Sequence, residues 1–299
     1  MNGPGERRGE VQSLQGALAD AGYVAEPGLA AAVLLMLELG RPLLVEGDAG
    51  VGKTEIALAV ARARGARLIR LQCYEGLDVQ AAMYEWNYQR QLLAIKLLEH
   101  DDRPAAAKEQ DIFSERYLLR RPLLEAIGCA EAPVLLIDEV DRADEAFEAY
   151  LLELLSDFQL SIPELGTVRA VTRPWVVLTS NGTRELSDAL RRRCLYQYID
   201  YPDADKERAI VELHMPHAGD ALARQVVQFV QDVRRMDLRR KPGIAETLDW
   251  TAALLRLGIT TLHPDGAARI LDTLAALVKT REDRTAFTRD AVERLAAAC

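Results

Sequence analysis

The feature that most constrains this chain is a glycine-rich segment that separates a short apolar run from a helical pattern. The apolar run covers residues 42–45, and the segment, residues 47–54, reads GDAGVGKT. The short run predicts a buried strand, and the apolar spacing over residues 56–63 predicts a helix. A G-x-x-x-x-G-K-[ST] loop between a strand and a helix is typical of a site for nucleotide phosphates.

Each residue type in this loop has a physical role. Glycine lets the backbone wrap around phosphates, and the N-terminus of the following helix adds partial positive charge. Lys53 is expected to bind the β- and γ-phosphates, and the Thr54 hydroxyl to bind Mg²⁺. The predicted nucleotide contacts are Gly47, Asp48, Ala49, Gly50, Val51, Gly52, Lys53, Thr54 and Glu55. A glycine-rich turn with a chance Lys-Thr pair is the alternative, which the strand and helix around the loop disfavour.

Short apolar runs and helical patterns alternate along the first two thirds of the chain. The further apolar runs cover residues 68–71, 134–137, 175–178 and 196–199. Strands that alternate with helices predict an α/β fold, in which helices cover both faces of a parallel sheet. Beyond residue 204 only helical patterns remain, one of them over residues 266–279.

This pattern predicts three parts. Residues 1–20 form a polar, helical N-terminal extension, and residues 21–204 form an αβα nucleotide-binding domain with a parallel sheet. Residues 205–299 form a small all-α lid domain. The length supports such a division, because a single core usually stops growing at about 250 residues.

Two of the predicted strands end in polar residues, at the edge of the sheet where α/β folds bind ligands. Asp138 and Glu139 follow one strand, and Asn181 follows the next. We expect Asp138 to hold Mg²⁺ together with Thr54, and Glu139 to polarise the attacking water. Asn181 is expected to orient that water or to sense the γ-phosphate. Without the upstream loop, the acidic pair would also fit a helix N-cap, and Asn181 an ordinary turn.

Three consecutive arginines, Arg191, Arg192 and Arg193, end a short helical pattern before the last predicted strand. Cations at a helix C-terminus are stabilised by the helix dipole, so an exposed basic end is one interpretation. The other is that one of these arginines neutralises charge on a phosphoryl group bound by a neighbouring subunit.

Composition limits the class of partner. The chain has 37 Lys and Arg against 46 Asp and Glu, a net charge of −9, which disfavours non-specific binding to nucleic acid or anionic membranes. The longest apolar stretch, residues 29–37, is about half of what a bilayer crossing needs. The first residues lack the apolar core of a signal peptide. We therefore expect a cytoplasmic protein without a membrane span and without a nucleic-acid partner.

The glycine-rich loop, the acidic pair, Asn181 and the arginine cluster, followed by helices, together resemble the AAA+ ATPase module. The resemblance covers nearly the whole chain from about residue 20. It implies that ATP and Mg²⁺ are the cofactors and that ATP is hydrolysed at subunit interfaces of a homo-oligomeric ring, commonly a hexamer. It also implies that Tyr23 and Val24 contact the adenine.

The same resemblance assigns further roles. Asn181 corresponds to sensor 1, and Arg193 is the best match for the arginine that acts on the neighbouring subunit, with Arg191 and Arg192 as reserves. The family often has a sensor 2 arginine at the start of a lid helix. Residues 243–248 offer none, so sensor 2 is left unassigned.

Two expected insertions resemble the MoxR branch of AAA+ proteins. One is an insert in helix 2 over about residues 74–112, and the other is a β-hairpin before sensor 1 over about residues 158–172. The amino-acid sequences of several segments most resemble those of CoxD-type accessory ATPases. These segments are residues 72–78, 84–88, 138–144 and 193–196. That subgroup assists the maturation of molybdenum hydroxylases such as carbon monoxide dehydrogenase. The resemblance thus implies a metalloenzyme client and a von Willebrand factor A domain partner.

Two alternatives to a protein remodeller stay open. Residues 138–141 also fit the D-E-x-D box of helicases, which would indicate a nucleic-acid-directed motor, but no second strand-rich domain follows. An ATP-locked scaffold with little turnover is the other alternative. Finally, Tyr84, Trp86 and Tyr88 alternate, which predicts three aromatic rings on one side of an extended segment. These rings would either grip a client or pack in the core.

Overall fold

The computed structural model describes residues 4–78, 82–98 and 103–299. It forms two compact units, each made of more than one stretch of chain. The first contains Met1–Leu14, Pro27–Glu46 and Ala57–Tyr198, and the second contains Gln15–Glu26, Gly47–Ile56 and Ile199–Cys299. The domain limits expected from the sequence stay predictions, and each unit is described by itself below.

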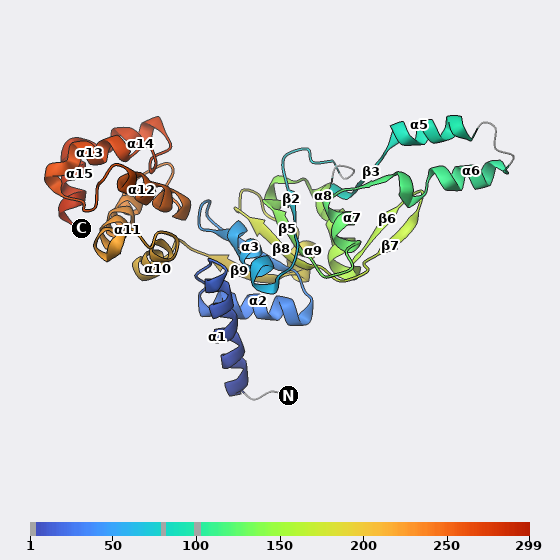
Figure 1. The fold of residues 1–299 in the computed structure, drawn as a ribbon, viewed down its shortest axis with the longest axis horizontal. Coiled ribbons are helices and arrows are strands. Elements are labelled where there is room, and N and C mark those ends of the chain that lie inside the picture. Colours follow the sequence, from blue (N-terminus) through green and yellow to red (C-terminus); the bar gives the residue numbers. More distant parts are fainter. Residues whose placement is uncertain (1–3, 79–81, 99–102) are drawn as a thin grey trace. The chain divides into compact units, whose positions relative to one another are not determined.

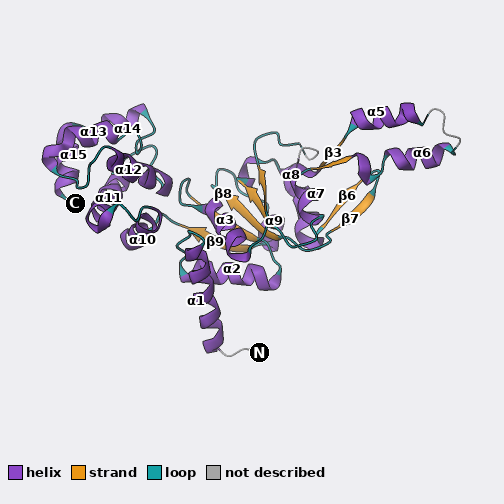
Figure 2. Cartoon of the chain, in the orientation of Figure 1, coloured by secondary structure: helices purple, strands orange, loops and turns teal. Residues whose placement is uncertain are grey.

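A five-stranded parallel sheet forms the centre of the first unit (Figures 1 and 2). Its strands in chain order are β1 (Leu43–Gly47), β2 (Leu68–Gln72), β5 (Val134–Asp138), β8 (Trp175–Ser180) and β9 (Leu195–Ile199). In space the order is β2-β5-β8-β1-β9. All residues of β5 are buried, as expected for a central parallel strand that is covered on both faces. The α/β fold class predicted from the apolar runs is confirmed.

Helices and short helical turns precede or connect these strands. They are α1 (Pro4–Asp20), α2 (Pro27–Leu39), α3 (Lys53–Arg64), α5 (Tyr88–Leu97), α6 (Ala105–Ile112), η1 (Glu115–Tyr117), α7 (Pro122–Ile127), η2 (Val140–Arg142), α8 (Glu145–Asp157) and α9 (Asp188–Arg193). The main core of this unit joins apolar side chains of the sheet to those of α7 and α8, among them Ile137, Leu124 and Phe147. This packing buries the sheet and fixes the strand ends that the candidate site uses.

Between β2 and β5 the chain forms a second, two-stranded sheet and a pair of helices, α5 and α6. Strands β3 (Tyr84–Trp86) and β4 (Leu118–Arg120) pair antiparallel, and α5 and α6 extend beyond them (Figure 1). The expected helix-2 insert falls on this region, although residues 79–81 and 99–102 lie outside the described residues. Its limits stay a prediction.

The expected row of three aromatic rings on one extended segment is wrong in its last member. Tyr88 begins helix α5 and is 61% exposed. The helix starts there because the side chain of Asn87 caps it, accepting a hydrogen bond of 3.1 Å from the backbone N–H of Arg90. Tyr84 and Trp86 do lie on one strand, and buried Trp86 packs edge-on against Phe113 at 5.5 Å between ring centroids.

A β-hairpin precedes β8 in the chain. Its strands, β6 (Gln159–Ile162) and β7 (Gly166–Arg169), pair antiparallel with Leu160 opposite Val168. The carboxylate of Glu153 accepts hydrogen bonds from the backbone N–H and the hydroxyl of Ser161, which ties the hairpin to α8.

Beyond β9 the described residues contain helices and no strand. They are α10 (Ala204–His214), α11 (Gly219–Arg235), α12 (Ile244–Arg256), η3 (Pro264–Gly266), α13 (Ala267–Thr273), α14 (Arg281–Thr285) and α15 (Arg289–Ala297). Their core includes Phe229 and Trp250, whose ring centroids are 4.8 Å apart. The helix expected over residues 266–279 is shorter: α13 ends at Thr273, whose hydroxyl donates back to the carbonyl of Ile270 and accepts from the Trp250 indole. Among the residues that the structure describes, we find no helix with the length and apolar character that a bilayer crossing requires.

Candidate active site

The glycine-rich loop has the backbone that phosphate binding requires. Gly50 and Gly52 have φ angles of +82° and +91°, a region that side chains other than glycine rarely adopt. Asp48, Ala49 and Gly50 are exposed, whereas Val51 is buried and anchors the loop. The loop therefore presents backbone to solvent at the start of α3, where the helix dipole favours an anion.

Lys53 is the first residue of α3 and is 7% exposed. Its ammonium group donates hydrogen bonds to the carbonyl oxygens of Gly47, at 2.8 Å, and Asp48, at 2.6 Å. The cation is thus held inside the curve of the loop, in the place expected of a group that binds phosphate. Thr54 and Glu55 follow in the same helical turn and are half-buried.

Asp138 and Glu139 stand at the carboxyl end of β5, and both contact Thr179 of the neighbouring strand β8. The Asp138 carboxylate is buried and accepts hydrogen bonds from the Thr179 hydroxyl, at 2.5 Å, and from the guanidinium of Arg70. The backbone N–H of Glu139 donates to the same hydroxyl at 2.9 Å. Thr179 therefore fixes both members of the acidic pair, a role that the sequence did not reveal.

The side chain of Glu139 leaves the sheet in an unusual direction. Its backbone is left-handed, with φ 53°, which is uncommon for a residue other than glycine and typical of functional sites. The carboxylate is 36% exposed and lies 3.1 Å from Nε of Arg142. It is therefore reachable from solvent, as a group that activates water must be.

Asp141 is a further residue of this site, which the sequence showed only as part of an acidic box. Its carboxylate is buried and accepts three hydrogen bonds: from the backbone N–H of Asn181 at 3.2 Å, and from the backbone N–H and hydroxyl of Thr183 at 2.9 and 2.6 Å. Burial raises the pKa of Asp141, but the hydrogen bonds from Thr183 and Asn181 outweigh it, and the pKa lies below its usual value.

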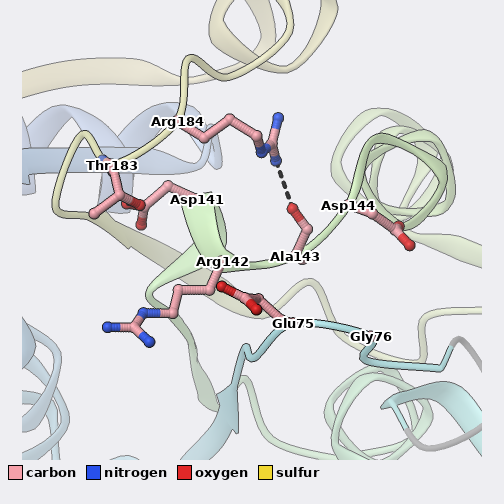
Figure 3. A pocket seen from close by; sticks show the side chains of 8 residues that line it. All are labelled: Glu75, Gly76, Asp141, Arg142, Ala143, Asp144, Thr183 and Arg184. Carbon is pink, nitrogen blue, oxygen red and sulfur yellow. Dashed lines mark hydrogen bonds between the residues drawn. The ribbon is translucent and has the colours of Figure 1, made fainter.

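An open cavity of about 520 Å³ borders this group (Figure 3). The residues that line it are Glu75, Gly76, Asp141, Arg142, Ala143, Asp144, Thr183 and Arg184. In Figure 3 the Thr183 side chain points to Asp141, and the Asp144 carboxylate points away from both. The cavity thus lies where the chain after β2, the turn after β5 and the loop after β8 come together.

Comparison with known families agrees with this geometry. A family model described as an AAA domain of the dynein-related subfamily matches residues 42–194, which is half of the chain. The chain belongs to this AAA family. It is therefore an ATPase with an ATP-binding AAA domain, and the predictions of ATP as ligand and of an ATP-hydrolysing enzyme are confirmed.

Two curated proteins and one solved structure are among those to which this chain is similar. The gas vesicle ATPase GvpN1 of Halobacterium salinarum is 28% identical over 263 residues, which cover 83% of this chain and 71% of the relative. GvpN2 of the same organism is 28% identical over 273 residues, which cover 86% and 74%. The RuvB Holliday junction branch migration motor of Thermotoga maritima aligns at 17% identity with a TM-score of 0.42, over 94% of this chain and 71% of RuvB.

The three consecutive arginines in the last turn of α9 have different surroundings. Arg191 forms an ion pair of 3.0 Å with Glu46, the residue before the phosphate loop. Arg193 donates to the hydroxyl of Ser156 through Nε. Arg192 is exposed, and we find no hydrogen bond or ion pair of its guanidinium within the described residues. The structure therefore separates the three candidates that the sequence could not distinguish.

The two predicted adenine contacts, Tyr23 and Val24, differ in burial. Tyr23 is buried, and its pKa is raised by burial first and then by the charges of Glu26 and Glu55. A Cβ atom on Gly52 would lie 3.9 Å from Cε2 of Tyr23, so the ring lies beside the phosphate loop. Val24 is half-buried.

The stretch without a sensor 2 arginine contacts the phosphate loop through its backbone. The N–H of Ile244 donates to the carbonyl of Gly50 at 2.9 Å. A Cβ atom on Gly243 would lie only 2.7 Å from Cα and the carbonyl oxygen of Gly50, so this approach requires glycine at position 243. The glycine was the one signal in the sequence that could have indicated the contact.

Proposed function

We propose that this AAA ATPase is a MoxR-type remodeller, which hydrolyses Mg·ATP at the subunit interfaces of a cytoplasmic ring, commonly a hexamer, and uses the energy to remodel or mature a protein client. The observation that carries the proposal is the phosphate loop, in which Lys53 lies inside a curve of backbone at the N-terminus of a helix. This arrangement binds phosphates through charge and N–H groups together.

In the proposed mechanism Lys53 and the loop N–H groups bind the triphosphate, and Thr54 and Asp138 hold the metal. Mg²⁺ is usually bound by one or two protein oxygens, with water and phosphate completing its ligands. This fits a chain in whose described residues we find no cluster of three or more His, Cys, Asp or Glu side chains that would hold a metal by itself. When bound, Mg²⁺ neutralises charge on the phosphate oxygens.

Glu139 is the proposed group that orients the attacking water and takes its proton, and Asn181 orients the same water or senses the γ-phosphate. The exposed carboxylate of Glu139 and its fixed, left-handed backbone support this role. Charge that develops on the phosphoryl group is stabilised by Lys53 and by an arginine of a neighbouring subunit.

Hydrolysis measured on three variants tests these roles. Lys53→Ala is expected to abolish binding of ATP in calorimetry with magnesium present. Glu139→Gln is expected to keep ATP binding and to lose turnover by about 10²- to 10⁴-fold, because general-base catalysis contributes that much. Glu145→Gln, the same exchange at an exposed residue in the first turn of α8 that no proposed step uses, is the control. Wild-type turnover in Glu139→Gln would refute the role of Glu139.

The arginine that acts in trans is tested by mixing. Arg193 is the first prediction, and Arg192 is its rival because its guanidinium is the exposed one. An alanine variant of the true residue binds ATP but hydrolyses it slowly. Mixed with Glu139→Gln protomers, it regains part of its turnover, since one interface then contains both intact groups. If mixed rings form and stay inactive for all three arginines, hydrolysis does not use this cluster.

The client is the open part of the proposal. Similarity of several segments to CoxD-type ATPases favours the metal centre of a molybdenum hydroxylase as client, with a von Willebrand factor A domain protein as partner. The relatives named gas vesicle ATPases favour a second candidate, assembly of a gas vesicle. Co-expression with each candidate client separates them: only the true client is expected to stimulate ATP turnover, and Glu139→Gln is expected to trap its complex.

The same ATP-turnover assays test two other functions. A nucleic-acid-directed motor would show ATP turnover that DNA or RNA stimulates and that falls steeply as salt rises. An ATP-locked scaffold would bind ATP with Glu139 and Asn181 intact and would show little turnover.

A further inference from the structure

We propose that Asp141 is a positioning residue for Asn181, which holds the loop after β8 in register with the acidic pair after β5. The proposal rests on the role proposed above for Asn181 in hydrolysis. It assigns to Asp141 a part in turnover without any contact with nucleotide, metal or water.

The Asp141 carboxylate is bound to the loop by three hydrogen bonds. Three donors converge on one carboxylate at 2.6 to 3.2 Å, and two of them are backbone N–H groups of Asn181 and Thr183. Asp141 is 3% exposed, so these bonds are shielded from competition by water. The backbone of Asn181 is therefore fixed by a residue 40 positions earlier in the chain.

Asp141 itself is rigidly joined to Glu139. Glu139 is the N-cap residue of the turn η2, and Asp141 lies within that turn. The N–H of Arg142 donates to the carbonyl of Glu139 at 2.9 Å, and that of Ala143 donates to the carbonyl of Val140 at 3.2 Å. A shift of Asp141 would therefore also move the backbone of Glu139. The Asp141 side chain thus links the two segments and keeps the distance between Glu139 and Asn181 constant.

The loop is also tied on this side by Arg184, which donates to the carbonyl of Ala143 at 2.7 Å and pairs with Glu148 of α8. These contacts hold the chain three residues beyond Asn181, whereas the Asp141 carboxylate binds the backbone of Asn181 and Thr183 themselves. Gly182 and Thr183 are exposed, and the cavity of about 520 Å³ lies beside them (Figure 3). The hydroxyl of Ser180 accepts from the N–H of Gly182, a bond within the loop that does not tie it to β5. Without the Asp141 carboxylate the loop has room to move into the cavity. A displacement of about 1 Å at a reacting group can cost on the order of 100-fold in rate.

A double-mutant cycle on ATP turnover tests the proposal. Asp141→Ala and Asn181→Ala are each expected to lower kcat by about 10- to 100-fold with little change in the Kd for ATP. If Asp141 acts through Asn181, the double variant is no slower than Asn181→Ala alone, because the second change removes an effect that is already absent. Asp141→Asn, which keeps the shape and one acceptor oxygen, is expected to recover part of the loss.

Asp144→Ala is the matched control. Asp144 lines the same cavity, but its carboxylate caps α8 by accepting from the N–H of Phe147 at 2.8 Å and points away from Asp141 (Figure 3). Its effect on kcat is expected to be small and to multiply with that of Asn181→Ala. Should Asp141→Ala fail to fold, Thr183→Val removes only the hydroxyl donor, and a smaller loss with the same lack of additivity is expected.

The outcomes separate two failures. A double variant slower than Asn181→Ala by the full factor of Asp141→Ala would overturn the positioning role and leave the role of Asn181 intact. Wild-type kcat in Asn181→Ala would refute the proposed role of Asn181 and, with it, the link to Asp141. A loss that appears only in KM or in the Kd for ATP would likewise overturn the proposal.

Discussion

Two groups of buried carboxylates, one in each compact unit, show how similar chemistry serves different ends. The strand-end cluster consists of Asp138, Asp141, Thr179 and Thr183. The helical cluster consists of Glu207, Arg234, Gln231 and Thr247. In both, threonine hydroxyls donate to a carboxylate, yet the two differ in what else surrounds the charge.

The helical cluster is closed. Glu207 of α10 is fully buried and accepts two parallel hydrogen bonds from Arg234 of α11, at 2.6 and 2.7 Å, and one from Thr247 of α12 at 2.7 Å. Three helices meet at one carboxylate whose charge is neutralised by a guanidinium. Such a pair joins the helices and has no side left open for a ligand.

The two acids of the strand-end cluster differ from Glu207 and from each other. Asp138 pairs with Arg70, whereas Asp141 accepts, within the described residues, from two N–H groups and a hydroxyl, and an open cavity lies beside it. Burial of a carboxylate therefore does not by itself mark a functional residue. What distinguishes the strand ends is that a buried acid, Asp141, lines an open cavity and bonds the backbone of Asn181.

The largest expected effect is on the stability of the helical cluster. Arg234→Ala leaves the Glu207 carboxylate buried without its cation, and breaking such a pair costs about 3–5 kcal/mol. Denaturant unfolding followed by circular dichroism measures the loss. Glu207→Leu combined with Arg234→Met removes both charges and is expected to recover most of it. A loss below about 1 kcal/mol in Arg234→Ala would show that water reaches the carboxylate.

The next effect distinguishes the two clusters by turnover. Thr179→Val keeps the shape of the side chain but removes the hydroxyl that bonds both the Glu139 N–H and the Asp138 carboxylate, and the loss of these buried hydrogen bonds costs about 1–3 kcal/mol in the free energy of unfolding. Because Glu139 loses a backbone anchor, kcat for ATP is expected to fall on the order of tenfold as well. Thr179→Ser, which restores the hydroxyl, is the control. Unchanged turnover in Thr179→Val would mean that the hydroxyl does not position Glu139.

Sequence reasoning succeeded where the signal is local. The five strands of the sheet appear as short apolar runs because a parallel strand buried on both faces tolerates few polar residues, and β5 is the clearest case. The phosphate loop was readable because its glycines and Lys53 are adjacent in the chain. The prediction for Tyr88 was wrong because it continued the strand-like alternation past Asn87, and Asn87 caps a helix.

Contacts between residues that are far apart in the chain could not be predicted from the sequence. Asp141 and Asn181 are 40 residues apart, and their bond depends on β5 lying next to β8 in the sheet, an order that the sequence does not encode locally. The approach of Gly243 to Gly50 has the same character, as it joins two segments of one unit that are far apart in the sequence. Such contacts result from tertiary packing, so no periodicity or motif announces them.

A smaller effect is expected from the matched change in the helical cluster. Thr247→Val removes one of several hydrogen bonds to Glu207, while Arg234 still neutralises the charge. We expect a loss of about 1 kcal/mol in the free energy of unfolding and unchanged kcat for ATP, measured beside Thr179→Val. If Thr247→Val slows hydrolysis as much as Thr179→Val does, the helical cluster also acts in turnover.

The smallest expected effect is a pH dependence that belongs to Asp141. Burial raises the pKa of Asp141, but the hydrogen bonds from Thr183 and Asn181 hold it below the usual value. A pKa that is lower in the folded than in the unfolded chain stabilises the fold above the unfolded value of about 3.9, and this stabilisation is lost as the pH falls through the folded pKa. The wild type is therefore expected to lose more free energy of unfolding between about pH 6 and pH 3 than Asp141→Asn does. Equal slopes for the two proteins over that range would mean that the carboxylate is no better stabilised in the fold than in water, and that it cannot fix the backbone of Asn181.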